Sequence, residues 1–223
     1  MTSSTAFLLT QPRMWLKRRE VCLRGFIDGS RDRRICGMSL EPFTASPYAE
    51  SHGAVETVSA PYGTLEVVFG PEMFTQDDVL LDAGCGLGRP IAYLLDSGFP
   101  GRLVGAELNP VVAAQTQKWA KEHDNVRIVC ADVFDLDIRP YTKFFMWYSM
   151  DADVLARFVA KIEREAEHPV RFFYVGNAGQ SVFASRARWK LSRAGWVYRV
   201  RGMLQHGVPT RYGIWDFDPA ESC

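Results

Sequence analysis

Short apolar runs alternate with longer amphipathic stretches along the chain from residue 79 onward. Such runs suit strands that are buried on both faces of a parallel sheet. The predicted strands are residues 79–81, 102–107, 126–130, 143–148 and 170–175. The predicted helices are residues 88–95, 109–122, 151–166 and 180–193. Two of these helices begin with typical start signals, Asn109-Pro110 and Asp151.

The alternation of strand and helix predicts an α/β fold, in which right-handed crossovers join a mostly parallel sheet. The last two apolar segments, 196–203 and 211–217, have no helix between them. We therefore expect an antiparallel strand at the end of the chain. Residues 64–69 follow a break at Pro61 and Gly63, and they suit either a short helix or an extended segment.

The first 45 residues lack this periodicity and are rich in basic side chains. The basic residues are Arg13, Lys17, Arg18, Arg19, Arg24, Arg31, Arg33 and Arg34, and the acidic ones are Glu20, Asp28, Asp32 and Glu41. We predict that residues 1–45 form a basic arm, disordered or loosely docked, and that residues 46–223 form the compact domain, starting with a helix at Ser46-Pro47. An arm that binds nucleic acid or a membrane surface, and a biological start at Met38, are alternatives.

Composition narrows the class of protein. The formal net charge is zero, so the whole chain provides no long-range attraction to nucleic acid. The five cysteines contain no C-x-x-C pair, which indicates reduced thiols in a cytoplasmic protein rather than a disulfide framework. No apolar run approaches the roughly 20 residues of a membrane span. No cluster of His, Cys and acidic residues has metal-ligand spacing, so we expect no metal.

The most informative motif is the glycine loop, which we define as residues 82–88, Asp-Ala-Gly-Cys-Gly-Leu-Gly. It lies between a predicted strand and a predicted helix, where glycines allow close backbone approach to a cofactor. The dinucleotide pattern G-x-G-x-x-G, begun at Gly84 and Gly86, would have its third glycine at position 89, where this chain has Arg89. The acidic Asp82 would repel a pyrophosphate but suits a ligand that carries positive charge.

This loop resembles motif I of the class I methyltransferases that depend on S-adenosylmethionine (SAM), in which Cys85 is a common variant. The resemblance covers roughly residues 46–218, and its specific part is residues 79–134. It implies a Rossmann-like three-layer sandwich whose mostly parallel seven-stranded sheet ends with an antiparallel strand. It also implies SAM as the cofactor.

Two further acids follow the next two predicted strands. A carboxylate at Glu107 can accept from both ribose hydroxyls, and the resemblance implies that Asp132 accepts from the adenine amino group. Taken singly, Asp82 suits a turn cap, Glu107 a helix-start charge and Asp132 a solvated loop residue. The predicted cofactor-binding residues are Asp82, Gly84, Cys85, Gly86, Gly88, Glu107, Leu108, Asp132, Val133 and Tyr62, the last from a proline-aromatic segment that some relatives place over the methionine end.

The fold implied by the resemblance places the methyl acceptor beyond the fourth strand. Amine-methylating relatives often carry Asn/Asp-Pro-Pro-aromatic at this position, whereas this chain has Trp147-Tyr148-Ser149. This departure disfavours methylation of adenine, cytosine or glutamine. Tyr148 is the candidate catalytic residue through its hydroxyl, and Trp147 or Tyr148 could face the sulfonium. His52 and His206 are candidate bases.

The sequence thus predicts a SAM-dependent methyltransferase that acts on a small molecule or a protein side chain, including lysine. An RNA or DNA methyltransferase and a non-catalytic SAM-binding module are the alternatives, although nucleic acid is the less expected partner. Arg89, which stands where a dinucleotide loop would continue, disfavours a dehydrogenase.

Overall fold

The structure is a computed structural model that describes residues 5–41, 59–177 and 179–220. Within these residues, seven strands form one sheet in the order β3-β2-β1-β4-β5-β9-β6. The strands are β1 (Val79–Ala83), β2 (Arg102–Glu107), β3 (Val126–Cys130), β4 (Lys143–Trp147), β5 (Val170–Val175), β6 (Trp189–Val197) and β9 (Thr210–Phe217). β9 is antiparallel to β5 and β6, and the other neighbouring pairs are parallel. The predicted sheet is confirmed, and its antiparallel strand lies between β5 and β6.

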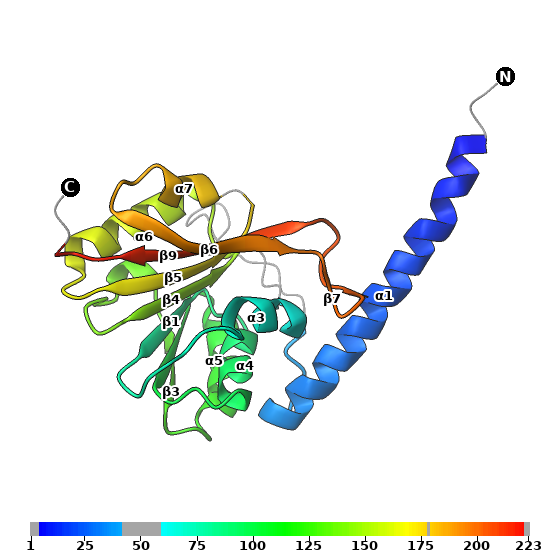
Figure 1. The fold of residues 1–223 in the computed structure, drawn as a ribbon. Coiled ribbons are helices and arrows are strands. Elements are labelled where there is room, and N and C mark those ends of the chain that lie inside the picture. Colours follow the sequence, from blue (N-terminus) through cyan, green and yellow to red (C-terminus); the bar gives the residue numbers. More distant parts are fainter. Residues whose placement is uncertain (1–4, 42–58, 178, 221–223) are drawn as a thin grey trace.

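Helices cover both faces of the sheet (Figure 1). The helices are α1 (Thr5–Cys36), α3 (Tyr62–Phe69), α4 (Arg89–Asp96), α5 (Pro110–Ala120), α6 (Ala152–Glu165) and α7 (Gln180–Ala184), with a 3-10 turn, η1 (Val133–Asp135). The α3, α4 and α5 helices lie on one face, and α6 and α7 lie on the other. The segment 64–69, for which the sequence left two options, is helical.

The strands separate two hydrophobic cores because successive side chains point to opposite faces. In β4, Phe145 belongs to the core beneath α3, α4 and α5. Its neighbours Phe144 and Met146 belong to the core beneath α6 and α7. All three side chains are fully buried. This arrangement confirms the three-layer sandwich.

The predicted helix at 180–193 is wrong beyond Ala184, because residues 189–197 form β6. Pairing with β9 and packing of Trp189 override the local helical preference. The Trp189 ring stacks on Phe217 at 5.1 Å between centroids. The predicted strand 196–203 is also divided, because Arg201 and Gly202 adopt positive φ angles in the turn between β7 (Arg199–Val200) and β8 (Met203–Leu204).

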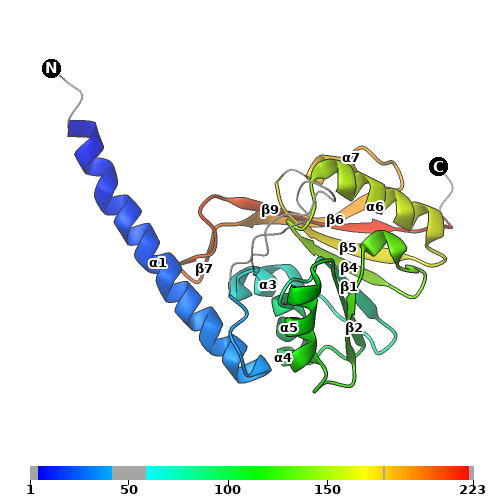
Figure 2. The same cartoon turned by 180° about the vertical axis from the view of Figure 1, so that it is seen from behind.

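The N-terminal segment differs most from its prediction. Residues 5–36 form one helix, which projects away from the sheet toward the N-terminus (Figures 1 and 2). Its last turns dock closely, because Asp28 and Asp32 are buried one helical turn apart. The expectation of disorder or loose docking is therefore wrong for this part of the segment. The helix start at Ser46-Pro47 lies outside the described residues, and the division of the chain at residue 45 stays a prediction.

Candidate active site

The glycine loop joins β1 to α4 in a backbone conformation that needs its glycines. Gly84, Gly86 and Gly88 have φ angles of 80°, 54° and 83°, which other residues rarely adopt. The backbone N–H groups of Gly84 and Cys85 both donate to the Ala106 carbonyl at 2.9 Å. These bonds hold the loop against the end of β2.

Glu107 connects the end of β2 to the middle of this loop. Its Oε2 accepts from the Gly86 N–H at 2.9 Å, and its Oε1 accepts from the Asn109 N–H at 2.8 Å. The side chain is only 9% exposed. Burial raises the pKa of Glu107, and the backbone donors oppose that rise. The carboxylate thus lies directly beside the loop, and its predicted contact with the ribose stays a prediction.

Asp82 is more buried still, at 1% exposed. Its Oδ2 atom has no hydrogen-bond partner within the described part of the chain. Burial raises the pKa of Asp82 well above its usual value, and the charge of Glu107 raises it further. A buried carboxylate oxygen without a donor is costly to maintain, so this atom is suited to receive a ligand donor.

The third acid, Asp132, begins η1 after β3. Its Oδ1 accepts from the Phe134 N–H at 3.0 Å, so it caps the turn, and Val133 beside it is buried. The three acids therefore end the adjacent strands β1, β2 and β3 at one edge of the sheet. This is the carboxyl edge, where ligands of open α/β sheets bind.

The other predicted loop residues are less available. The Cys85 thiol is buried, and this burial raises its pKa well above the usual value, so the thiol stays protonated. Leu108 is half-buried beside Glu107. These residues can offer backbone groups and apolar contact to a ligand.

The end of β4 crosses the glycine loop. Ser149 Oγ lies 3.2 Å from the Gly84 carbonyl and 3.0 Å from the Trp147 carbonyl, and it can donate a hydrogen bond to either of them. Tyr148 has a positive φ of 46°, which is uncommon for a residue with a side chain. Its hydroxyl lies 3.5 Å from Thr210 Oγ1 on β9.

The part of the chain that forms this edge of the sheet resembles known proteins. Residues 80–167 match the family model described as a methyltransferase domain. Over these residues the chain is similar to methyltransferase domains. The predicted resemblance to class I methyltransferases is thereby confirmed, and the subgroup is unassigned. No curated protein sequence matches the chain.

Solved structures share the fold of this domain. An RNA methyltransferase from Salinibacter ruber in complex with S-adenosyl-L-homocysteine has a TM-score of 0.55 at 19% identity, covering 74% of this chain and 96% of that one. The apo form of the mycolic acid cyclopropane synthase CmaA1 has a TM-score of 0.53 at 13% identity, covering 62% and 67%. Sp1610 of Streptococcus pneumoniae, a putative tRNA (m1A22) methyltransferase, has a TM-score of 0.54 at 12% identity, covering 72% and 72%.

The matched part of the methyltransferase domain runs from β1 through α6, and therefore contains the loop and the three acids. The segment that holds His206 lies outside the match.

His206 contacts α3 and the end of β4. Its Nε2 is 2.8 Å from Thr64 Oγ1 of α3, and its ring centroid is 5.1 Å from that of Trp147. Burial and the nearby Arg24 lower the pKa of His206 to about 4, so its ring is neutral near pH 7. His52, the other candidate base, lies outside the described residues.

Tyr62, the first residue of α3, contacts side chains of α1 and α4. The Arg31 guanidinium of α1 lies 4.3 Å from the centroid of its ring, and the Tyr93 ring of α4 lies 6.4 Å away. Burial and the neighbouring Asp32 raise the pKa of its hydroxyl. Its described contacts are thus with α1 and α4 rather than with the glycine loop, and a cofactor role for Tyr62 stays a prediction.

Sequence reasoning missed Arg89 as a part of this site. Its side chain is fully buried and paired with Asp32 of α1. An arginine within the apolar stretch before Ile91 and Ala92 was the available signal, because buried arginines require partners.

Within the described residues, no group of three or more His, Cys, Asp or Glu side chains could hold a metal. No helix among these residues is both long and apolar enough to cross a membrane.

Proposed function

We propose that the methyltransferase domain binds SAM at the glycine loop and transfers its methyl group to a small molecule or a protein side chain. The observation that carries this proposal is the unpartnered, buried Asp82 carboxylate beside Glu107. An ammonium group of the cofactor would supply the missing donor and compensate the charge. A pyrophosphate would be repelled by both carboxylates.

The remaining contacts fit a nucleoside. A carboxylate has about four lone-pair positions, and Glu107 uses one on each oxygen for backbone donors, which leaves positions for both ribose hydroxyls. Asp132 would accept from the adenine amino group, and Val133 and Leu108 would lie beside the adenine ring. Gly84, Gly86 and Gly88 allow the backbone to approach the ligand. SAM, when bound, supplies an electrophilic methyl group on its sulfonium.

The acceptor side is formed by the end of β4 and the segment around His206. Trp147 and Tyr148 form an aromatic wall, with ring centroids 5.2 Å apart in an edge-to-face arrangement. We propose that Tyr148 contacts the acceptor. A neutral imidazole at His206 is suited to remove a proton from an acceptor that needs it.

Charge pairing favours a small molecule or protein over nucleic acid. Arg31 and Arg34 of α1 bond to Asp96 of α4, and Arg24 contacts Asp28. These ion pairs partly neutralise the charge of the basic side chains, which reduces their attraction for phosphates. RNA is the second candidate acceptor, because the neighbours from Salinibacter ruber and Streptococcus pneumoniae are described as an RNA methyltransferase and a putative tRNA methyltransferase.

Cofactor binding is tested by calorimetry with SAM and S-adenosylhomocysteine. We expect wild-type protein to bind both, and Glu107→Gln to weaken binding about tenfold or more, since it removes a charged acceptor from the ribose. Glu122→Gln, a change at an exposed carboxylate after α5, is the matched control and leaves affinity unchanged. Absence of binding by the wild type, or unchanged affinity in folded Glu107→Gln, contradicts the proposal.

The acceptor class is tested by incubation with SAM that carries a labelled methyl group and a cell extract. Label in small molecules or in protein supports the proposal. Label in RNA, abolished by ribonuclease, favours the second candidate. Cofactor binding with no transferred label in any fraction contradicts an enzymatic role and indicates a SAM-binding module.

A further inference from the structure

We propose that α1 is a part of the cofactor site, in which its buried Asp32 acts as a positioning residue for the glycine loop. Asp32 acts through Arg89, the residue that follows the last glycine of the loop and begins α4. The inference rests on the proposed function, because the loop is taken as the SAM-binding element.

The contact between α1 and the loop is a buried, two-point ion pair. Arg89 Nε donates to Asp32 Oδ1 at 3.0 Å, and Nη2 donates to Oδ2 at 2.6 Å. Both side chains have no exposed surface. Glu41 contributes a third acceptor, 3.2 Å from Nη1. Two parallel bonds fix the direction of the guanidinium as well as its distance from Asp32.

Asp32 is itself held in place. Its Oδ2 also accepts from the backbone N–H of Leu40 at 3.0 Å, which closes the turn after α1. That turn passes through Gly37 at a φ of 71°, where the helix ends. The carboxylate is therefore fixed to both the last turns of α1 and the segment beyond it.

The opposite side of the loop is held by α5. Thr116 Oγ1 donates to the Gly86 carbonyl at 2.7 Å, and Trp119 Nε1 donates to the Leu87 carbonyl at 3.2 Å. The loop thus has an anchor on α5 for its middle and an anchor on α1, through Arg89, for its end. The second anchor comes from a segment outside the matched methyltransferase domain.

Loss of the Asp32 charge would leave the Arg89 guanidinium buried with its nearest carboxylate removed. Asp28 at 3.9 Å and Glu41 at 3.2 Å would remain, but neither replaces the two short bonds to Asp32. A buried cation that is only partly compensated is unfavourable, so the guanidinium would move toward water. Arg89 is covalently joined to Gly88, so that movement displaces the end of the loop. Cofactor affinity should then fall although Asp32 does not touch the cofactor.

The test compares full-length Asp32→Asn with the wild type in two measurements made well below the unfolding temperature. In the unliganded protein, we expect faster hydrogen exchange in peptides that cover residues 82–88, with exchange in β5 and β9 unchanged. In calorimetry with S-adenosylhomocysteine, we expect affinity to fall about tenfold. Asp96→Asn is the matched control, because it removes another α1–α4 ion pair at a more exposed site away from the loop, and should leave both readouts within twofold of the wild type.

Asp32→Glu covers the case in which Asp32→Asn does not fold. It keeps the compensating charge but lengthens the side chain by one methylene, so we expect a folded protein with intermediate effects on both readouts. Unchanged loop exchange and unchanged affinity in either folded variant overturn the inference. If the wild type does not bind S-adenosylhomocysteine, the proposed function fails. Hydrogen exchange of the loop in the unliganded variants still tests the role of Asp32.

Discussion

Asp28 is a buried carboxylate whose charge is only partly compensated. It is 4% exposed, its Oδ2 has no hydrogen-bond partner among the described residues, and Arg24 and Arg89 approach it only to 3.7 and 3.9 Å. Burial raises the pKa of Asp28 from 3.8 to about 6, against the attraction of both arginines, and Glu41 and Asp32 add to the rise. The ionised form is therefore disfavoured in the folded protein.

This pKa has a defined consequence for stability. A carboxyl group whose pKa is raised by folding stabilises the protein below its unfolded pKa, and that contribution is lost as the pH rises through the folded value, here about 6. Between pH 5 and pH 8 the wild type should lose about 1–1.5 kcal/mol that Asp28→Asn does not lose. Urea unfolding of both proteins at the two pH values measures this difference. An equal stability difference between the proteins at both pH values would show that Asp28 does not titrate in this range.

At the scale of single residues, the sequence predicted the acids of the site better than their partners. Asp82 and Glu107 could be placed because parallel strands end at one edge of a sheet. The pair formed by Asp32 and Arg89 could not be placed, because the two residues lie 57 positions apart and no local pattern joins them. The contacts of Tyr62 with α1 could not be predicted for the same reason.

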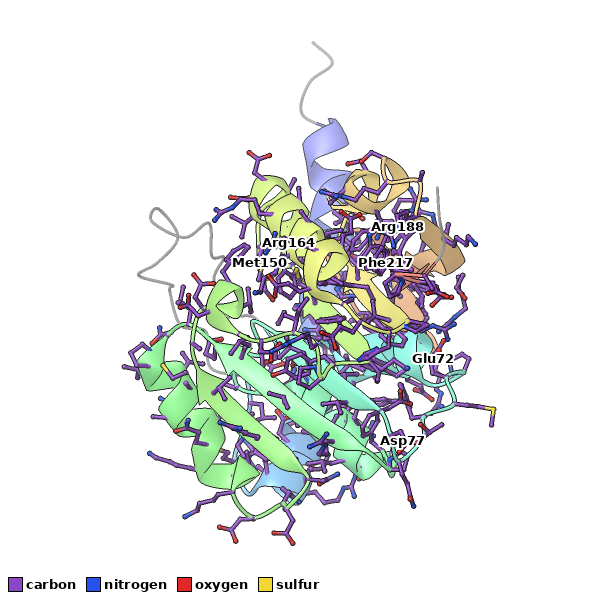
Figure 3. All side chains as sticks on the ribbon, turned by 90° about the vertical axis from the view of Figure 1, so that its left-hand side faces the viewer. Glu72, Asp77, Met150, Arg164, Arg188 and Phe217 are labelled. Carbon is purple, nitrogen blue, oxygen red and sulfur yellow. The ribbon has the colours of Figure 1, made fainter. Side chains whose placement is uncertain are left out.

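At the scale of elements, one carboxylate joins the loop after α3 to the strands β5 and β6. Glu72, labelled in Figure 3, accepts from Arg171 of β5 at 2.7 Å and from Arg193 of β6 at 2.9 Å. Arg193 also donates to the carbonyls of Val67 and Val68 in α3. These side-chain bonds add to the pairing of β6 with β9, which holds residues 189–193 as a strand rather than the predicted helix.

We expect Glu72→Gln to lower the free energy of unfolding by about 1–3 kcal/mol, because it weakens two charge-assisted hydrogen bonds at a mostly buried position. Binding of S-adenosylhomocysteine should be unaffected, since the loop 82–88 is anchored elsewhere. Urea unfolding and calorimetry check the two statements, with Glu122→Gln as the exposed control. Stability equal to that of the wild type would mean that solvent screens both pairs.

At the scale of the whole molecule, strands and helices between residues 79 and 175 were predictable because each has its own periodic pattern. The position of α1 could not be predicted from the sequence. The apolar positions of α1 show weak periodicity, and Leu23, Phe26 and Ile27 are exposed in the structure. Its docking depends on a few charged side chains whose partners lie on α4 and around Gln205, whose carbonyl accepts from Arg24. Charge pairing over such distances leaves no signal in local sequence.

A variant that begins at Met38 tests how much the domain depends on this helix. It would lack Asp28 and Asp32 and would leave the buried Arg89 with only Glu41, which is 38% exposed at its side chain. Removing one partner of a buried ion pair typically costs about 3–5 kcal/mol, so the variant should unfold at a markedly lower temperature than the full chain. Arg89→Met in the same variant removes the unpaired cation while keeping apolar volume, and should recover part of that loss. Thermal unfolding followed by circular dichroism measures both effects. If the shortened protein is as stable as the full chain, or if Arg89→Met lowers its stability further, the ion pair is not what joins α1 to the domain.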